Sequence, residues 1–426
     1  MKYNLKSINM MNWAKTLFPI NRSLTGKGVK QTISFAQKKI NKKFKNLKIK
    51  SNTKVFDWKV PYEWNISKAY IDEIDGKRIC DFKNNNLHIV GYSKNIKKIM
   101  SFQKLKHKIH YIKDKPNSVP YLTSYYKRDW GFCLSYNNFK KMKKNKKYRV
   151  VIEASYFKGN LNYSELLIKG RSKKEILVIS YICHPSMANN ELSGPLVVMA
   201  LSKVLRPSKY TVRLILIPET IGAIAYIKKN FLRLKKNLVA GFNLSCVGDK
   251  GPFTLISSKE GNTYADKVAR RVLSKKKKFK NVSFLKRGSN ERQFGCQNLN
   301  FPFVTICRTR FGDFSEYHTS DDNLKIISES NLRETLKQML KMIEEIQKNK
   351  IYTKNLNCEP FFTKYNLVRS SRNKANNKER DIFDIAAYVD RNYDEYELTK
   401  LLAKPKKNIK ENLKTLIKNK IIKEFV

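Results

Sequence analysis

Short apolar segments alternate with longer segments of helical pattern from about residue 148 to residue 350 of this chain. Strands are expected at residues 148–157, 164–170, 175–183, 210–218, 238–247 and 301–307. Helices are expected at Gly194 to Leu205, Ile221 to Phe231, Tyr264 to Leu273 and Glu329 to Gln347. Strands that are apolar along their length, with helices between them, are typical of a mostly parallel sheet covered on both faces. The sequence therefore predicts an α/β fold, with ligands bound at the carboxyl ends of the strands.

Other parts of the chain have different patterns. Residues 55–145 are rich in aromatic and β-branched residues and contain turn signals such as Asp75-Gly76, so a small β-rich module is expected. A polar stretch from Ser370 to Lys378 is typical of a linker. Residues 381–426 have the pattern of three short helices and a closing strand-like segment, which resembles a winged helix. Such a unit can bind DNA, but it also serves as a packing or dimerisation unit, and structural use is favoured.

The chain carries 88 lysine and arginine residues against 35 aspartate and glutamate residues, a net charge of +53. This charge would suit nucleic-acid binding. The lysines are spread over the whole chain, however, and lysine together with abundant asparagine, isoleucine and tyrosine is what an A+T-rich coding bias produces. Because net charge bears on solubility and nonspecific binding and not on fold, a nucleic-acid partner stays open but is not favoured.

Membrane and disulfide-rich classes are not expected. The longest apolar stretch, Leu214 to Ile227, is interrupted by Pro218 and Glu219 and is too short to span a bilayer. The N-terminus lacks a secretory signal pattern, so a cytoplasmic protein without a membrane partner is expected. The seven cysteines form no CxxC pair, which argues against a zinc ribbon and a disulfide framework.

Two of the five histidines stand near the ends of predicted strands. His184 follows the apolar segment ILVISYIC, with Glu191 on the same loop, and Glu219 follows the segment RLILIP. His318 lies among acidic residues in FSEYHTSDDN. Two histidines with carboxylates at strand ends suit a hydrolytic zinc site that keeps a position open for water. The other histidines are expected to be a hydrogen-bonded core residue, His88, and two solvated residues, His107 and His110.

Seven longer motifs then make the sequence recognisable. They are FPINRSLTGKGV (18–29), VFDWKVPYEWNI (55–66), PYLTSYYKRDWGFC (120–133), ICHPSMANNELSGP (182–195), IPETIGAIAY (217–226), GSNERQF (288–294) and RTRFGDFSEYHTSDDNL (308–324). In this order they resemble the aminopeptidase-like proteins often encoded in bacterial polysaccharide-biosynthesis clusters, which are distant relatives of the co-catalytic zinc aminopeptidases. The resemblance covers nearly the whole chain. It implies a zinc-aminopeptidase-like sheet flanked by helices (1–54 and 146–352), an inserted β-rich domain (55–145), a linker (353–380) and a C-terminal winged helix (381–426).

The resemblance also implies roles for individual residues. His184 matches the first metal histidine, and His318 matches the last. Glu219 matches the glutamate that acts as the general base of the catalytic reaction. Glu191 is predicted as a further ligand of a single zinc ion. Residues expected beside the ligands or against the substrate are Asn190, Asp249, Arg308 and Asp322, of which Asp322 matches the carboxylate after the last histidine.

The chain departs from the pattern of the active enzymes at four positions. Asn190 stands where they carry the aspartate that bridges two zinc ions, and Thr220 stands where a glutamate should follow the general base. Ser245 replaces the aspartate of the next strand, and Asn290 stands where relatives often have aspartate. An asparagine brings no negative charge to hold two dications together, so one zinc ion is expected in place of two.

Three functions remain open from the sequence. The first is a zinc-dependent hydrolase of an amide, acting on a peptide or an acylated amino sugar in surface polysaccharide biosynthesis. The second is a protein that has lost catalysis and uses the old cleft for binding or assembly in glycan production. The third is a DNA-binding regulator that acts through residues 381–426. A homo-oligomer is compatible with each of them.

Overall fold

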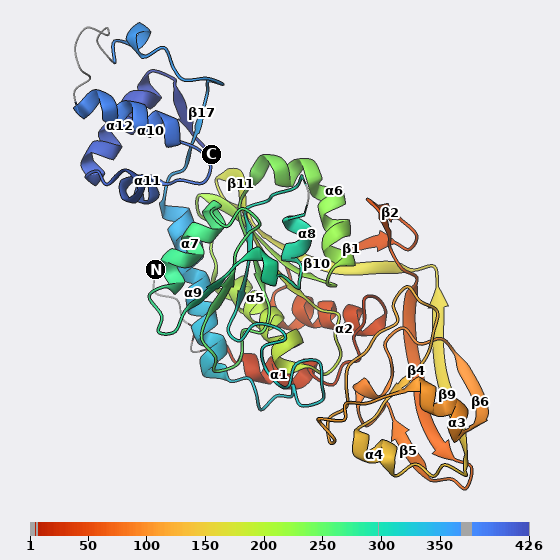
Figure 1. The fold of residues 1–426 in the computed structure, drawn as a ribbon. Helices are drawn as coiled ribbons and strands as arrows, with labels where there is room; N and C mark the ends of the chain where they lie inside the picture. The colour runs from red at the N-terminus through yellow and green to blue at the C-terminus, as the bar shows by residue number, and fades with distance from the viewer. Residues whose placement is uncertain (1–4, 6, 297, 368–376, 426) are drawn as a thin grey trace.

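The computed structural model describes residue 5 and residues 7–296, 298–367 and 377–425 of the chain (Figure 1). Its largest element is an eight-stranded sheet of β1 (Lys45–Lys50), β10 (Asn160–Ile168), β12 (Tyr210–Ile217), β11 (Ser172–Tyr181), β13 (Leu238–Leu244), β16 (Phe303–Cys307), β14 (Thr254–Ile256) and β15 (Lys280–Val282), in this spatial order. Strands β12, β11, β13 and β16 run parallel in the centre. β1 and β10 are antiparallel additions at one side, and β14 is antiparallel to β16. The predicted mostly parallel sheet is therefore confirmed.

Helices cover both faces of this sheet (Figure 1). One face carries α1 (Met10–Leu17), α2 (Lys27–Phe35), α5 (Ser193–Val204), α7 (Tyr264–Leu273) and α9 (Glu329–Lys348), which share an apolar core with the strands. The other face carries α6 (Ile221–Asn237) and the short α8 (Glu291–Phe294). The four predicted helices correspond to α5, α6, α7 and α9, although α6 continues beyond the predicted end at Phe231 through a kink at Asn230.

A second sheet, of β5 (Arg78–Asp81), β4 (Glu63–Glu73), β9 (Lys147–Phe157) and β6 (Ile96–Ser101), has an apolar core of its own. The segment 148–157 was expected in the large sheet, and the structure instead pairs it, as β9, with β4 and β6. The reason is a mostly alternating pattern: Tyr148, Val150 and Ile152 face the small core and Arg149 and Glu153 are exposed, although Val151 is buried as well. One buried face and one exposed face are typical of an antiparallel sheet. This sheet therefore extends beyond residue 145.

Short elements complete the β-rich part. They are β2 (Lys54–Val55), β3 (Trp58–Lys59), η2 (Asn86–His88), α3 (Phe102–Leu105), η3 (Lys106–Lys108), β7 (Ile109–His110), β8 (Phe132–Cys133) and α4 (Tyr136–Lys140). The expected positions of the three histidines here are confirmed. His88 is half-buried and its Nδ1 lies 2.8 Å from the carbonyl oxygen of Cys133, whereas His107 and His110 are exposed.

The C-terminal unit contains α10 (Asn377–Tyr388), α11 (Glu395–Leu402) and α12 (Lys406–Lys418). Strands β17 (Tyr352–Lys354) and β18 (Ile422–Glu424) pair antiparallel beside them. The unit has its own apolar core and projects from the end of the molecule near α7 and α9 (Figure 1). Three helices and a closing strand agree with the expected order of elements, and the winged-helix fold itself stays a prediction. Residues 368–376, within the predicted linker, lie outside the described residues.

Within the described part of the chain, none of the helices combines the length and apolar character that a membrane crossing needs.

Candidate functional site

The ends of neighbouring parallel strands bring the predicted site residues together. Cys183 and His184 follow β11, and Glu219 follows β12. The long loop after β16 carries His318, whose φ of 55° is left-handed. Because β11 and β12 are parallel neighbours, their carboxyl ends meet at one edge of the sheet. The rings of His184 and His318 lie there with their centroids 5.7 Å apart.

Glu191 fixes the orientation of the His184 ring. It lies on the π-helical turn Ala188–Leu192 that leads into α5, and its Oε2 is 2.8 Å from His184 Nδ1. Nδ1 therefore donates a hydrogen bond to the carboxylate. Burial lowers the pKa of His184, but Cys183 and Glu191 outweigh it and raise this pKa well above its ordinary value. The other nitrogen, Nε2, faces Glu219, whose Oε2 is 3.7 Å away. A carboxylate on the far nitrogen is the usual partner that sets the tautomer of a metal-binding histidine.

A buried arginine, Arg22, contacts both Glu191 and the backbone of His184. The side chains of Arg22 and Glu191 are both 0% exposed, and Arg22 Nε lies 3.3 Å from Glu191 Oε1. The same Nε donates to the carbonyl oxygen of His184 at 3.0 Å, and Nη1 donates to that of Leu17 at 2.8 Å. Burial lowers the pKa of Arg22, and the negative charge of Glu191 opposes that shift. Arg22 therefore neutralises Glu191, which leaves this carboxylate to position His184 more than to attract a cation.

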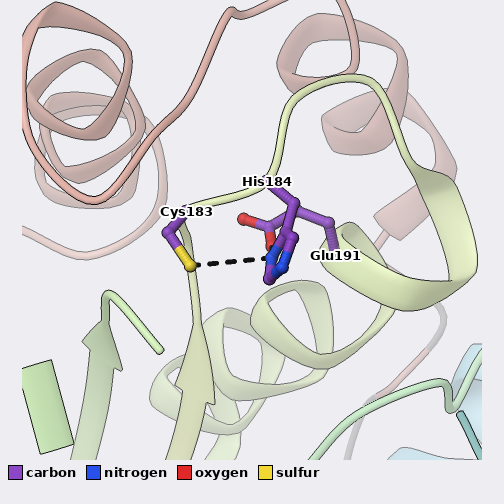
Figure 2. Close-up of side chains that lie close together, drawn as sticks. All are labelled: Cys183, His184 and Glu191. Carbon is purple, nitrogen blue, oxygen red and sulfur yellow. Dashed lines mark hydrogen bonds and ion pairs between the residues drawn. The ribbon is translucent and has the colours of Figure 1, made fainter. Parts of the chain in front are cut away.

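Cys183, His184 and Glu191 form a tight buried group at the start of the loop (Figure 2). One ligand atom from each lies within 4.8 Å of the other two, which is close enough to hold a metal ion. Glu191 Oε2 is hydrogen-bonded to His184, however, and Oε1 is ion-paired with Arg22 at 3.3 Å, although Oε1 accepts no hydrogen bond from the described residues. Burial also raises the pKa of the Cys183 thiol, so the sulfur stays protonated. This group is better suited to holding His184 in place than to binding an ion alone.

His318 and Glu219 complete the site. The His318 ring stacks on Tyr317 with centroids 3.9 Å apart, and its nitrogens have no hydrogen-bond partner among the described residues. Burial and the nearby His184 lower the pKa of His318 to about 3, so the ring is neutral and keeps a free lone pair. Burial raises the pKa of Glu219, although His184 and a hydrogen bond from Ser289 oppose it. The Ser289 hydroxyl donates to Glu219 Oε1 at 2.5 Å, and Oε2 remains directed to His184.

The β-rich part of the chain closes one side of the site. The Tyr121 ring lies edge-on to both His184 and His318, with centroids 5.2 Å from each. Its backbone N–H donates to the carbonyl oxygen of His318 at 2.8 Å, and its hydroxyl is 3.1 Å from that of Tyr125. Burial raises the pKa of both tyrosines well above the ordinary value, so both side chains are neutral where they line the site.

Neutral hydrogen bonds join Asn190 and Ser245, two positions at which the resemblance implies carboxylates in the active enzymes. The Tyr181 hydroxyl is 2.9 Å from Asn190 Oδ1 and 2.6 Å from Ser245 Oγ. All three residues are buried at the carboxyl ends of β11 and β13. Tyr181 thus joins the two substituted positions directly, and this neutral cluster satisfies their polar atoms without a metal ion.

The other two departures are also satisfied within the protein. Arg292 Nη2 donates to Thr220 Oγ1 at 2.7 Å, and the Thr220 N–H donates to Asn290 Oδ1 at 3.1 Å. Asn290 Nδ2 in turn contacts Asn243 Oδ1 at 3.3 Å. Thr220 has a φ of 59°, which is strained for a β-branched residue and which these bonds hold in place.

The remaining predicted residues, Asp322, Asp249 and Arg308, lie at increasing remove from the histidines. Asp322 accepts the backbone N–H groups of Asn189 at 2.7 Å and Asn190 at 2.9 Å, and so holds the π-helical turn. Asp249 accepts from the Asn189 side chain at 2.6 Å, one step further from the histidines. Arg308 is not brought to the histidines. It pairs with Glu334 at 2.9 Å and donates to the carbonyl oxygen of Gly251.

Sequence reasoning assigned no role to several residues that build the site. Arg22, Tyr121 and Ser289 lie within the recognisable motifs, but only the fold brings them to His184, His318 and Glu219. No spacing rule could have joined Arg22 to His184, since they are 162 positions apart. The sequence showed each of these polar residues within a longer motif. A motif indicates that a residue matters, but it does not say which residue it contacts.

His184 and Glu219 offer two donor atoms for a metal ion, and the His318 ring lies beside them. Two histidines and a glutamate are an established zinc ligand set. Ligand atoms about 2.1 Å from a tetrahedral ion lie about 3.4 Å from each other, and the 3.7 Å between His184 Nε2 and Glu219 Oε2 is close to this value.

Comparisons with known proteins agree with the resemblance and the fold. The family model described as Domain of unknown function (DUF4910) matches residues 11–349. A protein of Clostridium acetobutylicum is 40% identical over 363 residues, which are 84% of this chain and 82% of that protein. Its name, a provisional one, is polysaccharide biosynthesis protein with aminopeptidase-like domain.

Solved structures extend this comparison. A crystal structure of a provisionally named peptidase from Clostridium acetobutylicum has a TM-score of 0.78 and 36% identity, and covers 97% of this chain and 96% of that chain. BSAP, a zinc aminopeptidase from Bacillus subtilis, has a TM-score of 0.58 and 14% identity, and covers 79% of this chain and 93% of that chain. The likeness to BSAP shows a shared fold. The predicted zinc-aminopeptidase-like sheet is therefore confirmed.

Proposed function

The chain belongs to the family described as Domain of unknown function (DUF4910), and on that premise we propose that it is an aminopeptidase-like protein of polysaccharide biosynthesis that binds its ligand at a single-zinc site without hydrolysing it efficiently. The observation that carries this proposal is the neutral cluster of Tyr181, Asn190 and Ser245. With Glu191 neutralised by Arg22, Glu219 is left to supply negative charge to a metal ion beside the histidines.

His184 Nε2, His318 and Glu219 would hold the ion. Zinc bound there would act as a Lewis acid toward a carbonyl oxygen, which a peptide or an acylated amino sugar both offer. Glu191 would keep the His184 ring oriented through Nδ1, and Tyr121 would shield one side from water. A carboxylate that coordinates a metal is a poor proton acceptor, so the ligand role proposed for Glu219 excludes its predicted role as general base.

Elemental mass spectrometry of the full chain, purified without chelators, tests the site. We expect near one zinc ion per chain in the parent protein and none in His184→Ala and His318→Ala, because the two imidazoles supply most of the donor set. Glu219→Gln should also lose the ion. His107→Ala is the matched control, since His107 is exposed and distant from the cluster. No zinc in the parent protein, even after zinc is supplied, would contradict the single-zinc site.

A second candidate function is a zinc-dependent amide hydrolase. The observation that favours it is the raised pKa of Glu219, whose Oε2 faces the histidines and could accept a proton as a general base. Under this alternative Glu219→Gln would keep its zinc and lose turnover on a panel of peptides and N-acylated amino sugars. Turnover by the parent protein that disappears in His318→Ala would contradict the binding role.

A further inference from the structure

A cavity of about 450 Å³ lies between the α/β core and the C-terminal unit, away from the strand ends that carry the histidines. Its core side is formed by the end of α6, the start of α7 and residues 299–302. Its other side is formed by residues 390–393 and Phe425 of the C-terminal unit. A volume of this size is within the range of small-molecule sites.

A buried lysine, Lys267, lines this cavity. Lys267, on α7, is only 6% exposed. Its Nζ donates to the carbonyl oxygen of Asn392 at 3.0 Å and lies 3.3 Å from the ring centroid of Tyr393. Among the described residues, no carboxylate lies within the 4 Å that defines an ion pair with this Nζ. Buried ammonium groups are normally paired, because leaving a charge unpaired away from water is costly.

The other charged groups around the cavity are two basic residues, Lys235 and Arg391, and two acidic residues, Asp390 and Glu260. Lys235 is exposed at its edge, and the Arg391 guanidinium covers the Phe425 ring at 4.7 Å. Asp390 and Glu260 also line it, and Glu260 already accepts a hydrogen bond from Asn300. Just outside, burial together with Arg391, Lys236 and Lys423 lowers the pKa of Lys174 to about 8. Within the described part of the chain, neither Asp390 nor Glu260 is ion-paired with Lys267.

We propose that this cavity binds a small organic anion, with its phosphate or carboxylate group on Lys267, Lys235 and Arg391. The cavity is much larger than a bare phosphate. Its apolar lining, from Leu238, Leu299 and Phe301, gives an organic body a surface to contact. A bound oxyanion supplies the charge that Lys267 lacks, and a charge-assisted hydrogen bond is about twice as strong as a neutral one. Because both sides of the cavity contribute, the ligand also bridges the core and the C-terminal unit.

Calorimetric titration of the full chain tests this proposal. The probes are phenyl phosphate and benzoate, which carry the two kinds of oxyanion, and phenol, which has the same ring without the charged group. We expect phenyl phosphate or benzoate to bind and phenol not to bind. Lys267→Met should weaken the binding by about tenfold or more, the effect of losing one charged hydrogen bond.

Two further variants separate a built site from general attraction to a basic protein. Lys235→Glu changes an exposed residue at the cavity edge and should weaken binding without unfolding the chain. Lys229→Glu makes the same change on an exposed position of α6 that does not line the cavity, and should leave binding unchanged. Equal weakening by both, or equal binding of phenol, would overturn the proposal. So would undiminished binding by Lys267→Met.

Discussion

At the scale of single residues, the contacts that link Arg22, Glu191 and His184 have the strictest electrostatic requirement. Arg22 and Glu191 are removed completely from water, and each charge is tolerable only because of the other. One carboxylate oxygen contacts Arg22 and the other contacts His184, so the charge pair also fixes the ring. We interpret this arrangement as a way to keep the His184 ring oriented at a site where the resemblance implies that Asn190 replaces a bridging aspartate.

Glu191→Gln tests this interpretation. It keeps the shape of the side chain but leaves the Arg22 guanidinium buried without a counter-charge. We expect the free energy of unfolding to fall by about 3–5 kcal/mol, measured by urea denaturation. The matched control is Glu153→Gln, which breaks the exposed pair of Lys68 and Glu153 and should cost less than about 1 kcal/mol. Similar losses of unfolding free energy in the two variants would show that the buried pair of Arg22 and Glu191 stabilises the protein no more than an exposed pair does.

The entry to α2 shows how elements of different parts of the chain depend on each other. Gly26 precedes the helix with a φ of 94°, and Asn65 of β4 accepts the Lys27 N–H at 2.7 Å. A strand of the β-rich part thus supplies the cap that Gly26 lacks. A Cβ on Gly26 would come within 2.1 Å of the Trp64 carbonyl oxygen, so the strand and the helix can approach only through glycine.

Gly26→Ala should therefore destabilise the protein by more than backbone strain alone. The strain of a left-handed alanine costs about 1–3 kcal/mol, and displacing Trp64 adds to it. Gly76→Ala is the matched control, because Gly76 has a φ of 100° with nothing within 4 Å of the added Cβ. Thermal unfolding of the two variants should show the larger loss for Gly26→Ala. Equal losses of thermal stability would mean that the Trp64 backbone can move away from the added Cβ at no cost in free energy.

At the scale of the whole molecule, the main feature is how the α/β core contacts the β-rich part and the C-terminal unit. The loop of the β-rich part that carries Tyr121 also pairs with the loop of His318, since Val119 and Ser320 exchange backbone and side-chain hydrogen bonds at 2.9 Å. At the opposite end, Arg271 of α7 binds the buried Asp394 through two hydrogen bonds of 3.0 Å. The C-terminal unit is therefore fixed to the core through a bidentate charge pair.

Arg271→Met should loosen the C-terminal unit. It leaves Asp394, which is 0% exposed, without its cation, and we expect the opening free energy of α11 to fall by about 3–5 kcal/mol. Hydrogen exchange of the α11 amides measures this. Arg270→Met is the control, because Arg270 lies next in the same helix but donates to the carbonyl oxygen of Gly261 instead. Unchanged exchange in Arg271→Met would show that other contacts hold the unit.

The sequence alone determined the α/β class, the four main helices and the strand ends at which His184 and Glu219 stand. These features depend on local hydrophobic periodicity, which a chain carries in its own order of residues. The recognisable motifs added the family and its fold. Local pattern misplaced the segment 148–157, because a strand's pattern does not state which sheet it joins.

Only the tertiary structure decided the partners. It placed Arg22 behind Glu191, Tyr181 between Asn190 and Ser245, and Tyr121 against both histidines. It also moved Arg308 away from the site and left Lys267 unpaired beside a cavity. The physical reason is that burial, charge pairing and hydrogen bonding act through distances in space, and residues far apart in the chain acquire those distances only when the strands and helices pack.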